Sequence, residues 1–571
     1  MPQTRLQAGL DAGRVFVRSL PARILRWDRV LVLSVVIGAL AGVQGLTWGG
    51  YDCLNLDRMA FMSLTSKSRG YLEPSTFDKP PFYGYLVHFG VVSPGNSLAR
   101  KASRLGFDKT VVEGVRLRGQ VIAVRLVHVA MFAACVVFVF LYARRFFGLA
   151  AARASAVLLA TAAGFVPYQV FLTTDLPLVF WMLAALMACA WIMRSPTMGP
   201  SVLAGVLTGF AAATKYNGLA IGLGIPVAHL LAASPRPLLD TLKRPAAYAG
   251  VLAVPIAFIA ANPYCVIKSQ KFLADFMFNY RVTPVYSGQT GLGYGRFFGA
   301  FAEIFGSPLA WLLPAIVALG AWGMIANRRD PMWRGFALVA ACFLLYAWKI
   351  GSFPRIETRF VLPAAPLLLL MAAPGFAWLA ERSRWLAAGL VVPLAAYGAA
   401  CSWYTASRFP NDPRMAALAW AEEHFPPKAS VETTGSCPSW KKMPERKLQV
   451  TRMPFNVGQV ALFDKIFAND RWVQDRVDQD RAQKDAGWFT AEALKARNPD
   501  FITVSSIDQE ETTKEFYRQL IEGELGYRVV FAGETEPLPV WVYPQRTEFL
   551  INRITILERA SAVPPEPAST P

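Results

Sequence analysis

The feature that most constrains this chain is a succession of apolar blocks, each about as long as a helix that crosses a bilayer. Such a helix needs roughly 20 apolar residues to span about 30 Å of hydrocarbon with its backbone hydrogen bonds made internally. Hydrophobic residues make up 54% of the 571 residues and charged residues 17%, a balance that excludes an ordinary soluble enzyme. The blocks lie at residues 30–46, 120–142, 149–167, 175–193, 202–214, 218–233, 245–262, 308–326, 333–349, 360–379 and 385–404. They predict a polytopic α-helical membrane protein with about eleven transmembrane helices.

Basic residues between the blocks predict the topology, because cytoplasmic loops of membrane proteins collect Lys and Arg. Alternation from a cytoplasmic N-terminus puts these basic residues on the inner side: Arg144, Arg145, Arg194, Arg236, Lys243, Arg244, Arg328, Arg329, Arg334, Arg382 and Arg384. The Arg-rich segment 1–29 then lies inside, and residues 405–571 lie outside. The formal net charge of +19 suits the anionic lipids of a bilayer. No nucleic-acid-binding motif accompanies it, so no nucleic acid is expected as a partner.

The count of spans is weakest at residues 202–233, where the polar stretch 214–217 interrupts a long apolar run. Two short spans with a polar turn outside fit this composition, and so does one bent span. One bent span would reverse the side of every later loop and destroy the agreement with the basic residues. We therefore predict two spans, at 202–214 and 218–233.

The composition changes after residue 404, from apolar blocks to a mixture of charged and polar residues. We predict a transmembrane domain at 30–404, with long outer loops at 48–119 and 263–307, and a soluble α/β domain at 405–559. The expected elements beyond residue 404 are helices at 413–424, 491–497 and 512–520, strands at 429–433 and 501–504, and a disordered tail rich in Pro, Ala and Ser at 560–571.

Acidic and basic side chains gather in the first outer loop, in the segments LNLDRMAF and FDKPPFYGYL. These segments place Asp57 just after the first span and Lys79 just before an aromatic helix. Together with GYLEP, TTDLPLVF, TKYNG, ANPY and RIETRFVLPAAPLLLL, they resemble the GT-C superfamily of polyprenyl-phosphate-sugar-dependent glycosyltransferases. That superfamily includes protein O-mannosyltransferases and lipid A aminoarabinose transferases. The resemblance covers most of residues 50–375 and implies a GT-C fold with a catalytic outer loop.

The resemblance assigns the role of catalytic base to Asp57, which would take the proton of the acceptor hydroxyl as the lipid phosphate leaves. Relatives commonly carry Asp-Glu here, whereas this chain has Arg58 after Asp57, which makes Arg58 a candidate for phosphate binding instead. Lys79 resembles the family lysine that binds the carrier phosphate. Asp78 and Tyr83, which flank it, are candidate substrate contacts. A solvated carboxylate at Asp57 and an interfacial lysine at Lys79 are the alternatives.

Later polar residues are predicted to lie at the same face of the membrane. Asp175 begins the fourth span and is a candidate second acid of the active site; capping of the helix N-terminus is its alternative. Lys215 and Tyr216 lie in an outer turn, where a lysine needs an anion or water. In the segment RIETRF, Arg359 is a candidate ligand of the donor phosphate and Glu357 a candidate substrate contact. Anchoring at the membrane edge is the alternative for Arg359.

These residues predict an enzyme that transfers one sugar from a polyprenyl-phosphate donor at the periplasmic face of a bacterial inner membrane. The acceptor would be a lipopolysaccharide, another envelope glycan or lipid, or a protein. The histidines and cysteines show no metal-ligand spacing, so no metal site is predicted, and a divalent metal stays open as a cofactor. The alternatives are a transporter or lipid flippase, whose charges would line a path through the bilayer, and a non-catalytic scaffold.

Overall fold

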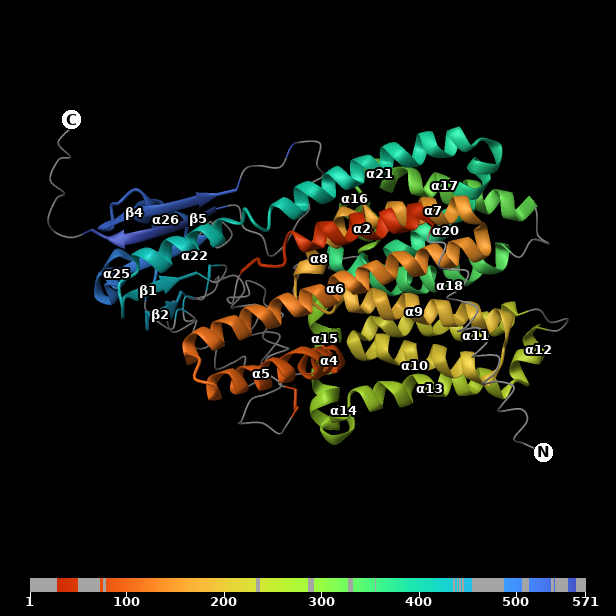
Figure 1. The fold of residues 1–571 in the computed structure, drawn as a ribbon, viewed down its shortest axis with the longest axis horizontal. Coiled ribbons are helices and arrows are strands. Elements are labelled where there is room, and N and C mark those ends of the chain that lie inside the picture. Colours follow the sequence, from red (N-terminus) through yellow and green to blue (C-terminus); the bar gives the residue numbers. More distant parts are fainter. Residues whose placement is uncertain are drawn as a thin grey trace.

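A bundle of apolar helices and a small sheet with flanking helices follow each other along the chain (Figure 1). The computed structural model describes residues 28–49, 72–74, 77, 79–232, 237–285, 292–326, 332–354, 356–434, 437–438, 440, 443, 446–453, 487–505, 513–535, 539 and 553–560. The predicted cytoplasmic segment up to residue 27 and the predicted disordered tail from residue 561 lie outside the described residues.

The bundle contains helices of membrane-spanning length, as the sequence predicts. Six described helices are long and apolar enough to cross a bilayer: Val111–Phe147, Asp175–Arg194, Ser307–Ile325, Met332–Gly351, Ala364–Arg382 and Arg384–Ser407. A seventh path, Leu149–Ala160 with Ala163–Val170, is bent by 52°, and four shorter apolar helices lie at Arg29–Val43, Met198–Thr214, Tyr216–Leu231 and Pro245–Ala261. The polytopic helical class is thus confirmed. The number of eleven spans stays a prediction, because the four shorter helices have only 10–17 residues.

The described parts of the two long loops predicted from the sequence contain several helices. The bundle and its loops comprise α2 (Arg29–Val43), α4 (Phe82–Val87), the π-helical turn η2 (His88–Val92), α5 (Ser93–Arg104), α6 (Lys109–Phe147), α7 (Leu149–Ala160), η3 (Ala163–Phe165), α8 (Val166–Val170), α9 (Asp175–Arg194), α10 (Met198–Thr214), η4 (Tyr216–Leu223), α11 (Gly224–Leu231), α12 (Pro237–Leu242), α13 (Pro245–Ala261), α14 (Tyr264–Ile267), α15 (Ser269–Val285), α16 (Tyr294–Phe305), α17 (Ser307–Ala326), α18 (Met332–Gly351), α19 (Thr358–Val361), α20 (Ala364–Arg382) and α21 (Arg384–Ser407). Loop 48–119 thus holds α4, η2, α5 and the start of α6, and loop 263–307 holds α14 to α16.

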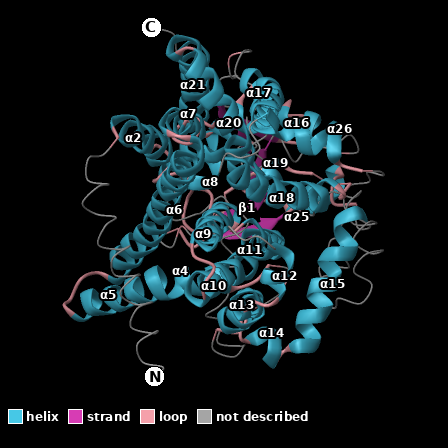
Figure 2. Cartoon of the chain, turned by 90° about the vertical axis from the view of Figure 1, so that its right-hand side faces the viewer, coloured by secondary structure: helices cyan, strands magenta, loops and turns pink. Residues whose placement is uncertain are grey.

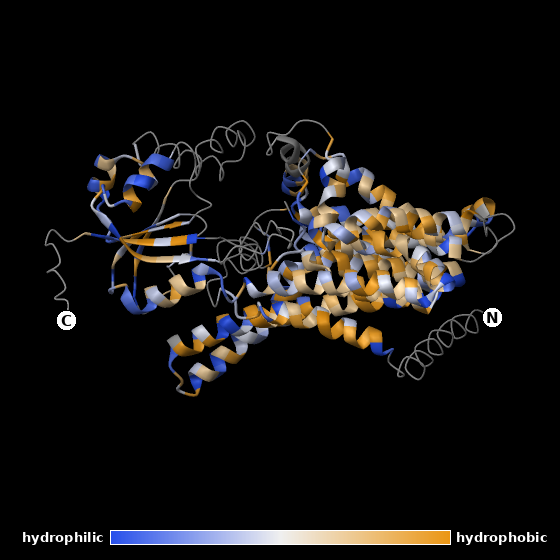
Figure 3. Cartoon of the chain, turned by 90° about the horizontal axis from the view of Figure 1, so that it is seen from above, coloured by the Kyte–Doolittle hydropathy of each residue, from blue (hydrophilic) through white to orange (hydrophobic). Residues whose placement is uncertain are grey.

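With 39 residues, α6 is about 58 Å long, so its first turns and α5 project beyond the bundle on the side of the sheet (Figures 1 and 3).

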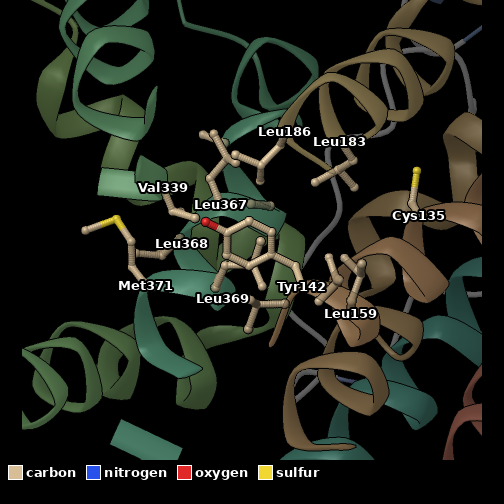
Figure 4. Close-up of a cluster of buried hydrophobic side chains, with 14 of the residues drawn as sticks. Cys135, Tyr142, Leu159, Leu183, Leu186, Val339, Leu367, Leu368, Leu369 and Met371 are labelled. Atoms are coloured by element: carbon tan, nitrogen blue, oxygen red, sulfur yellow. The ribbon is translucent and has the colours of Figure 1, made fainter. Parts of the chain in front are cut away.

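Small residues allow the bundle helices to pack closely. A Cβ atom on Gly205 of α10 would lie 2.1 Å from the carbonyl oxygen of Gly250 in α13, and one on Gly209 would lie 2.7 Å from that of Val254. The two helices therefore touch along their backbones, as small-residue pairs in membranes do; Figure 2 shows them side by side. Elsewhere in the bundle Tyr142 is buried among leucines of several helices (Figure 4).

The C-terminal part is an α/β structure, as predicted. Its elements are α22 (Pro413–His424), β1 (Ser430–Thr433), β2 (Gln449–Arg452), α25 (Ala491–Arg497), β3 (Phe501–Ser505), α26 (Lys514–Ile521), β4 (Tyr527–Glu534) and β5 (Arg553–Arg559). The strand order is β2-β1-β3-β5-β4, with β2, β1 and β3 parallel and the last two antiparallel to their neighbours. All three predicted helices and both predicted strands are present, whereas β2, β4 and β5 were not predicted. Hydrophilic residues are more frequent here than in the bundle (Figure 3).

Buried polar contacts join the sheet part to one end of the bundle. The Trp48 indole N–H, just beyond α2, donates a hydrogen bond to Asp412 Oδ2 at 2.9 Å, and Asp412 also pairs with Arg414 at 2.7 Å. At the same end the Arg125 guanidinium of α6 donates to the carbonyl oxygens of Leu46 and Trp48, each at 2.7 Å, and to that of Val170 at 2.9 Å. We call this end of the bundle, which carries Trp48, Val170 and the start of α9, the sheet-side end.

Candidate functional site

A buried ion pair forms the centre of the candidate site at the sheet-side end. Asp175 is the first residue of α9, and its Oδ1 lies 2.5 Å from the Lys215 ammonium; the two side chains are 3% and 17% exposed. Asp175 follows the helix N-cap, Thr174, rather than serving as the cap itself. Asp175 is therefore the partner of Lys215 rather than the helix cap, and its predicted role as a second acid stays a prediction. The ion pair also gives Lys215 the anion that the sequence argument required.

Two further cations lie near Asp175. Arg359 and Lys79 both lie close enough to Asp175 to act on its charge. Arg359 in addition pairs with Glu357 at 2.5 Å, where the two side chains are 19% and 8% exposed. The cluster thus contains the cations Lys79, Lys215 and Arg359 and the carboxylates of Asp175 and Glu357. Three cations near one another at one end of a helical bundle, two of them paired with carboxylates, form an environment suited to a phosphate group.

The position of Lys215 follows from a break between α10 and η4. Lys215 is extended, with φ −158° and ψ 131°, and the chain then turns back along the end of α10. Gly218 makes the return possible, since a Cβ atom there would lie 2.5 Å from the carbonyl oxygen of Ala211. The segment around the predicted polar turn is therefore two separate helical pieces rather than one bent helix. Whether each of them crosses the bilayer stays a prediction.

A chain of hydrogen bonds fixes Lys215 against the Arg359 segment. The Asn217 side-chain amide donates to Tyr346 Oη at 2.8 Å, and that hydroxyl donates to the Phe360 carbonyl oxygen at 2.9 Å. The Phe360 ring also lies beneath both cations, 5.0 Å from Lys215 Nζ and 5.4 Å from the Arg359 guanidinium carbon. Cation–π contact of this kind stabilises a partly desolvated charge. Residues more than 100 positions apart are thus held together at the site.

The other predicted site residues stand as follows. Asp57, Arg58 and Asp78 lie outside the described residues, so their predicted roles stay predictions. Tyr83, in α4, is 1% exposed and stacks on His128 at a centroid distance of 5.6 Å. Its predicted substrate contact, like those of Tyr216 and Glu357, stays a prediction.

Sequence reasoning missed three residues that support the site. Tyr346 links the Lys215 and Arg359 segments, Asp275 accepts a hydrogen bond from the backbone of Phe77, and Glu303 accepts one from Thr358. A signal for the two acids was present, because Asp275 and Glu303 are the only Asp or Glu residues between positions 263 and 307. Tyr346 gave none, since it lies inside an apolar block.

The described side chains do not form a metal site. No group of three or more His, Cys, Asp or Glu residues in this part of the chain is placed to hold a metal ion. Asp57 and Asp78 lie outside the described residues. The cations of the cluster are groups that can bind an anion directly.

Comparisons with known proteins point to one fold. A family model described as dolichyl-phosphate-mannose-protein mannosyltransferase matches residues 115–264. The crystal structure of ArnT from Cupriavidus metallidurans bound to undecaprenyl phosphate matches with a TM-score of 0.51 and 14% sequence identity, covering 94% of this chain and 99% of ArnT. The apo structure of the same protein has a TM-score of 0.52 and 15% identity over the same shares. No curated protein sequence gives a significant match. The chain is therefore a multi-pass membrane protein with the GT-C glycosyltransferase fold that its sequence predicted.

Proposed function

We propose that this protein is a membrane glycosyltransferase that moves a monosaccharide from a polyprenyl-phosphate donor to an acceptor. The observation that carries the proposal is the cluster of Lys79, Lys215 and Arg359 around Asp175 at the sheet-side end of a GT-C bundle. The matched family contains dolichyl-phosphate-mannose-dependent transferases, and the matched ArnT structure holds undecaprenyl phosphate. Both relatives thus support a lipid-linked phosphate as the group that the cluster binds.

In the proposed reaction the acceptor hydroxyl oxygen attacks the anomeric carbon of the sugar. The bond between that carbon and the phosphate oxygen breaks, and the acceptor proton passes to the Asp57 carboxylate. Polyprenyl phosphate leaves with the electron pair, and Lys79, Lys215 and Arg359 stabilise its charge, with Arg58 as a further candidate. Asp175 keeps the Lys215 ammonium in place and orients the acceptor or sugar.

The location and the acceptor complete the proposal. We infer a bacterial inner membrane with residues 1–29 in the cytoplasm and the catalytic loops and residues 405–559 in the periplasm. The positive-inside distribution of Lys and Arg supports this orientation. The acceptor is a lipopolysaccharide, another envelope glycan or lipid, or a protein.

A transporter or flippase is the less favoured alternative. Its charged groups would line a path from one side of the bilayer to the other. The predicted site cations in the described part of the chain instead gather at one end of the bundle, next to Asp175. The structural and family matches also favour transfer chemistry.

The experiment that tests the proposal measures sugar transfer by purified protein supplied with a radiolabelled polyprenyl-phosphate sugar and candidate acceptors. We expect transfer by the wild type, loss of turnover in Asp57→Asn, and weakened use of the donor in Lys79→Ala. Lys495→Ala, on the exposed face of α25, is the matched lysine control and should transfer normally. Normal turnover in Asp57→Asn would remove Asp57 as the base. No transfer from any donor to any acceptor would count against the enzyme itself.

A further inference from the structure

Phe77 is held on three sides, two residues before Lys79. Its side chain is 1% exposed and lies edge-on to the Phe272 ring of α15, with the ring centroids 5.6 Å apart. Its backbone N–H donates to Asp275 Oδ2 at 2.8 Å, and its carbonyl oxygen accepts from the Tyr216 hydroxyl at 2.7 Å. Side chains from two distant elements thus satisfy both polar groups of this one peptide residue.

The two side chains that hold Phe77 connect it to the rest of the site. Tyr216 directly follows Lys215, so the hydroxyl contact ties the Lys79 segment to the Lys215 turn. The Tyr216 ring also packs edge-on against Phe276 at 4.9 Å, which joins it to the same helix that carries Asp275. Phe77, η4 and α15 therefore form one packed unit, which we call the Phe77 clamp.

A similar arrangement exists at the other basic segment. Glu303 of α16 accepts a hydrogen bond from the Thr358 hydroxyl, one residue before Arg359. The two acids of residues 263–307 thus each hold a segment that carries a candidate phosphate ligand. In both hydrogen bonds the acid accepts from a group beside the cation rather than from the cation itself.

We propose that Asp275 is a positioning residue, which places the Lys79 ammonium at the donor phosphate by fixing the Phe77 peptide. This inference rests on the proposed function. Lys79 lies on the loop segment between Phe77 and α4. A fixed peptide at Phe77 therefore limits the positions that the Lys79 ammonium group can sample. A lysine that samples fewer positions loses less conformational freedom when the phosphate binds.

Hydrogen exchange tests the contact without any substrate. In Asp275→Ala the amide of Phe77 loses its acceptor, and we expect its exchange with deuterium to be about tenfold faster, as for the loss of one hydrogen bond. Asp275→Asn keeps a side-chain oxygen and should restore slow exchange. Unchanged exchange in Asp275→Ala would overturn the clamp, whether or not the protein transfers a sugar.

Steady-state kinetics test the consequence. Asp275→Ala should raise the KM for the polyprenyl-phosphate sugar about tenfold and leave kcat nearly unchanged, because Asp275 acts through the place of Lys79 rather than on the reacting atoms. Lys271→Ala is the matched control, since it removes the 2.8 Å ion pair to Asp275 and leaves the Phe77 contact. Because the Lys271–Asp275 ion pair is half-exposed, its loss in Lys271→Ala should change the KM by less than about twofold.

The outcomes separate this inference from the proposed function. Faster exchange with an unchanged KM would overturn the positioning role while leaving the enzyme in place. A loss in Asp275→Asn as large as in Asp275→Ala would overturn it as well, because charge rather than the hydrogen bond would then matter. If the wild-type protein transferred no sugar, the proposed function would be wrong. Deuterium exchange of the Phe77 amide would still decide whether the Phe77 clamp exists.

Discussion

Replacing both partners of the Asp175–Lys215 ion pair should restore stability that replacing either partner removes. Breaking a buried pair typically costs about 3–5 kcal/mol, because the remaining charge is left without its closest partner. Here Lys215 is 17% exposed, and Arg359 and Lys79 still act on Asp175. We therefore expect Lys215→Met to cost about 2–3 kcal/mol, somewhat less than the usual loss, and Asp175→Asn a similar amount.

The double variant carries the decisive comparison. Asp175→Asn with Lys215→Met leaves no uncompensated charge at this pair, so it should be more stable than the sum of the single losses by about 2 kcal/mol. Thermal unfolding of the four proteins in detergent gives the order of their Tm values, and a transfer assay on the same samples should show no recovery of activity. Arg528→Ala, at an exposed ion pair of the sheet, is the control and should hardly change the Tm. A loss of stability in the double variant equal to the sum of the two single losses would refute the coupling between Asp175 and Lys215.

Three further results are expected. Gly218→Ala should cost about 1–3 kcal/mol and raise the donor KM, because its Cβ would lie 2.5 Å from the Ala211 carbonyl oxygen; an unchanged Tm would contradict this. Trp48→Phe removes a buried 2.9 Å hydrogen bond to Asp412, so protease should cut faster between bundle and sheet, whereas equal rates would show that the contact is dispensable. A reporter fused after residue 404 should be active in the periplasm, and a cytoplasmic signal would overturn the topology.

The bundle could be predicted from the sequence because its cause is local. A block of membrane length must be helical in lipid, whatever it packs against, and α9 accordingly runs over Asp175–Arg194 where 175–193 was predicted. The strands β4 and β5 were missed, since a short strand is specified by its partners as much as by its own residues. Their pairing joins segments that the chain separates by about twenty residues.

The charged residues of the site could be predicted from the sequence, whereas the residues that hold them in place could not. Lys215 and Arg359 were expected at the same face as Asp175, because charged residues at span ends lie where the topology puts them, and all three belong to one cluster. The Phe77 contacts with Tyr216 and Asp275 span 139 and 198 positions of sequence. No periodicity or motif marks such pairs, and only the packing of α15 against η4 and Phe77 brings them together.

Arg125 gives the sheet-side end a set of contacts that does not depend on a carboxylate. Its guanidinium donates to the carbonyl oxygens of Leu46 and Trp48, in the turns that follow α2, and to that of Val170, the last residue of α8. Arginine keeps its proton throughout the physiological range and offers a rigid fork of donors, which neither histidine nor lysine does. The contacts that Arg125 makes should therefore persist when the surrounding medium is acidified, whereas the contacts of Asp175 and Asp412 at the same end depend on carboxylates.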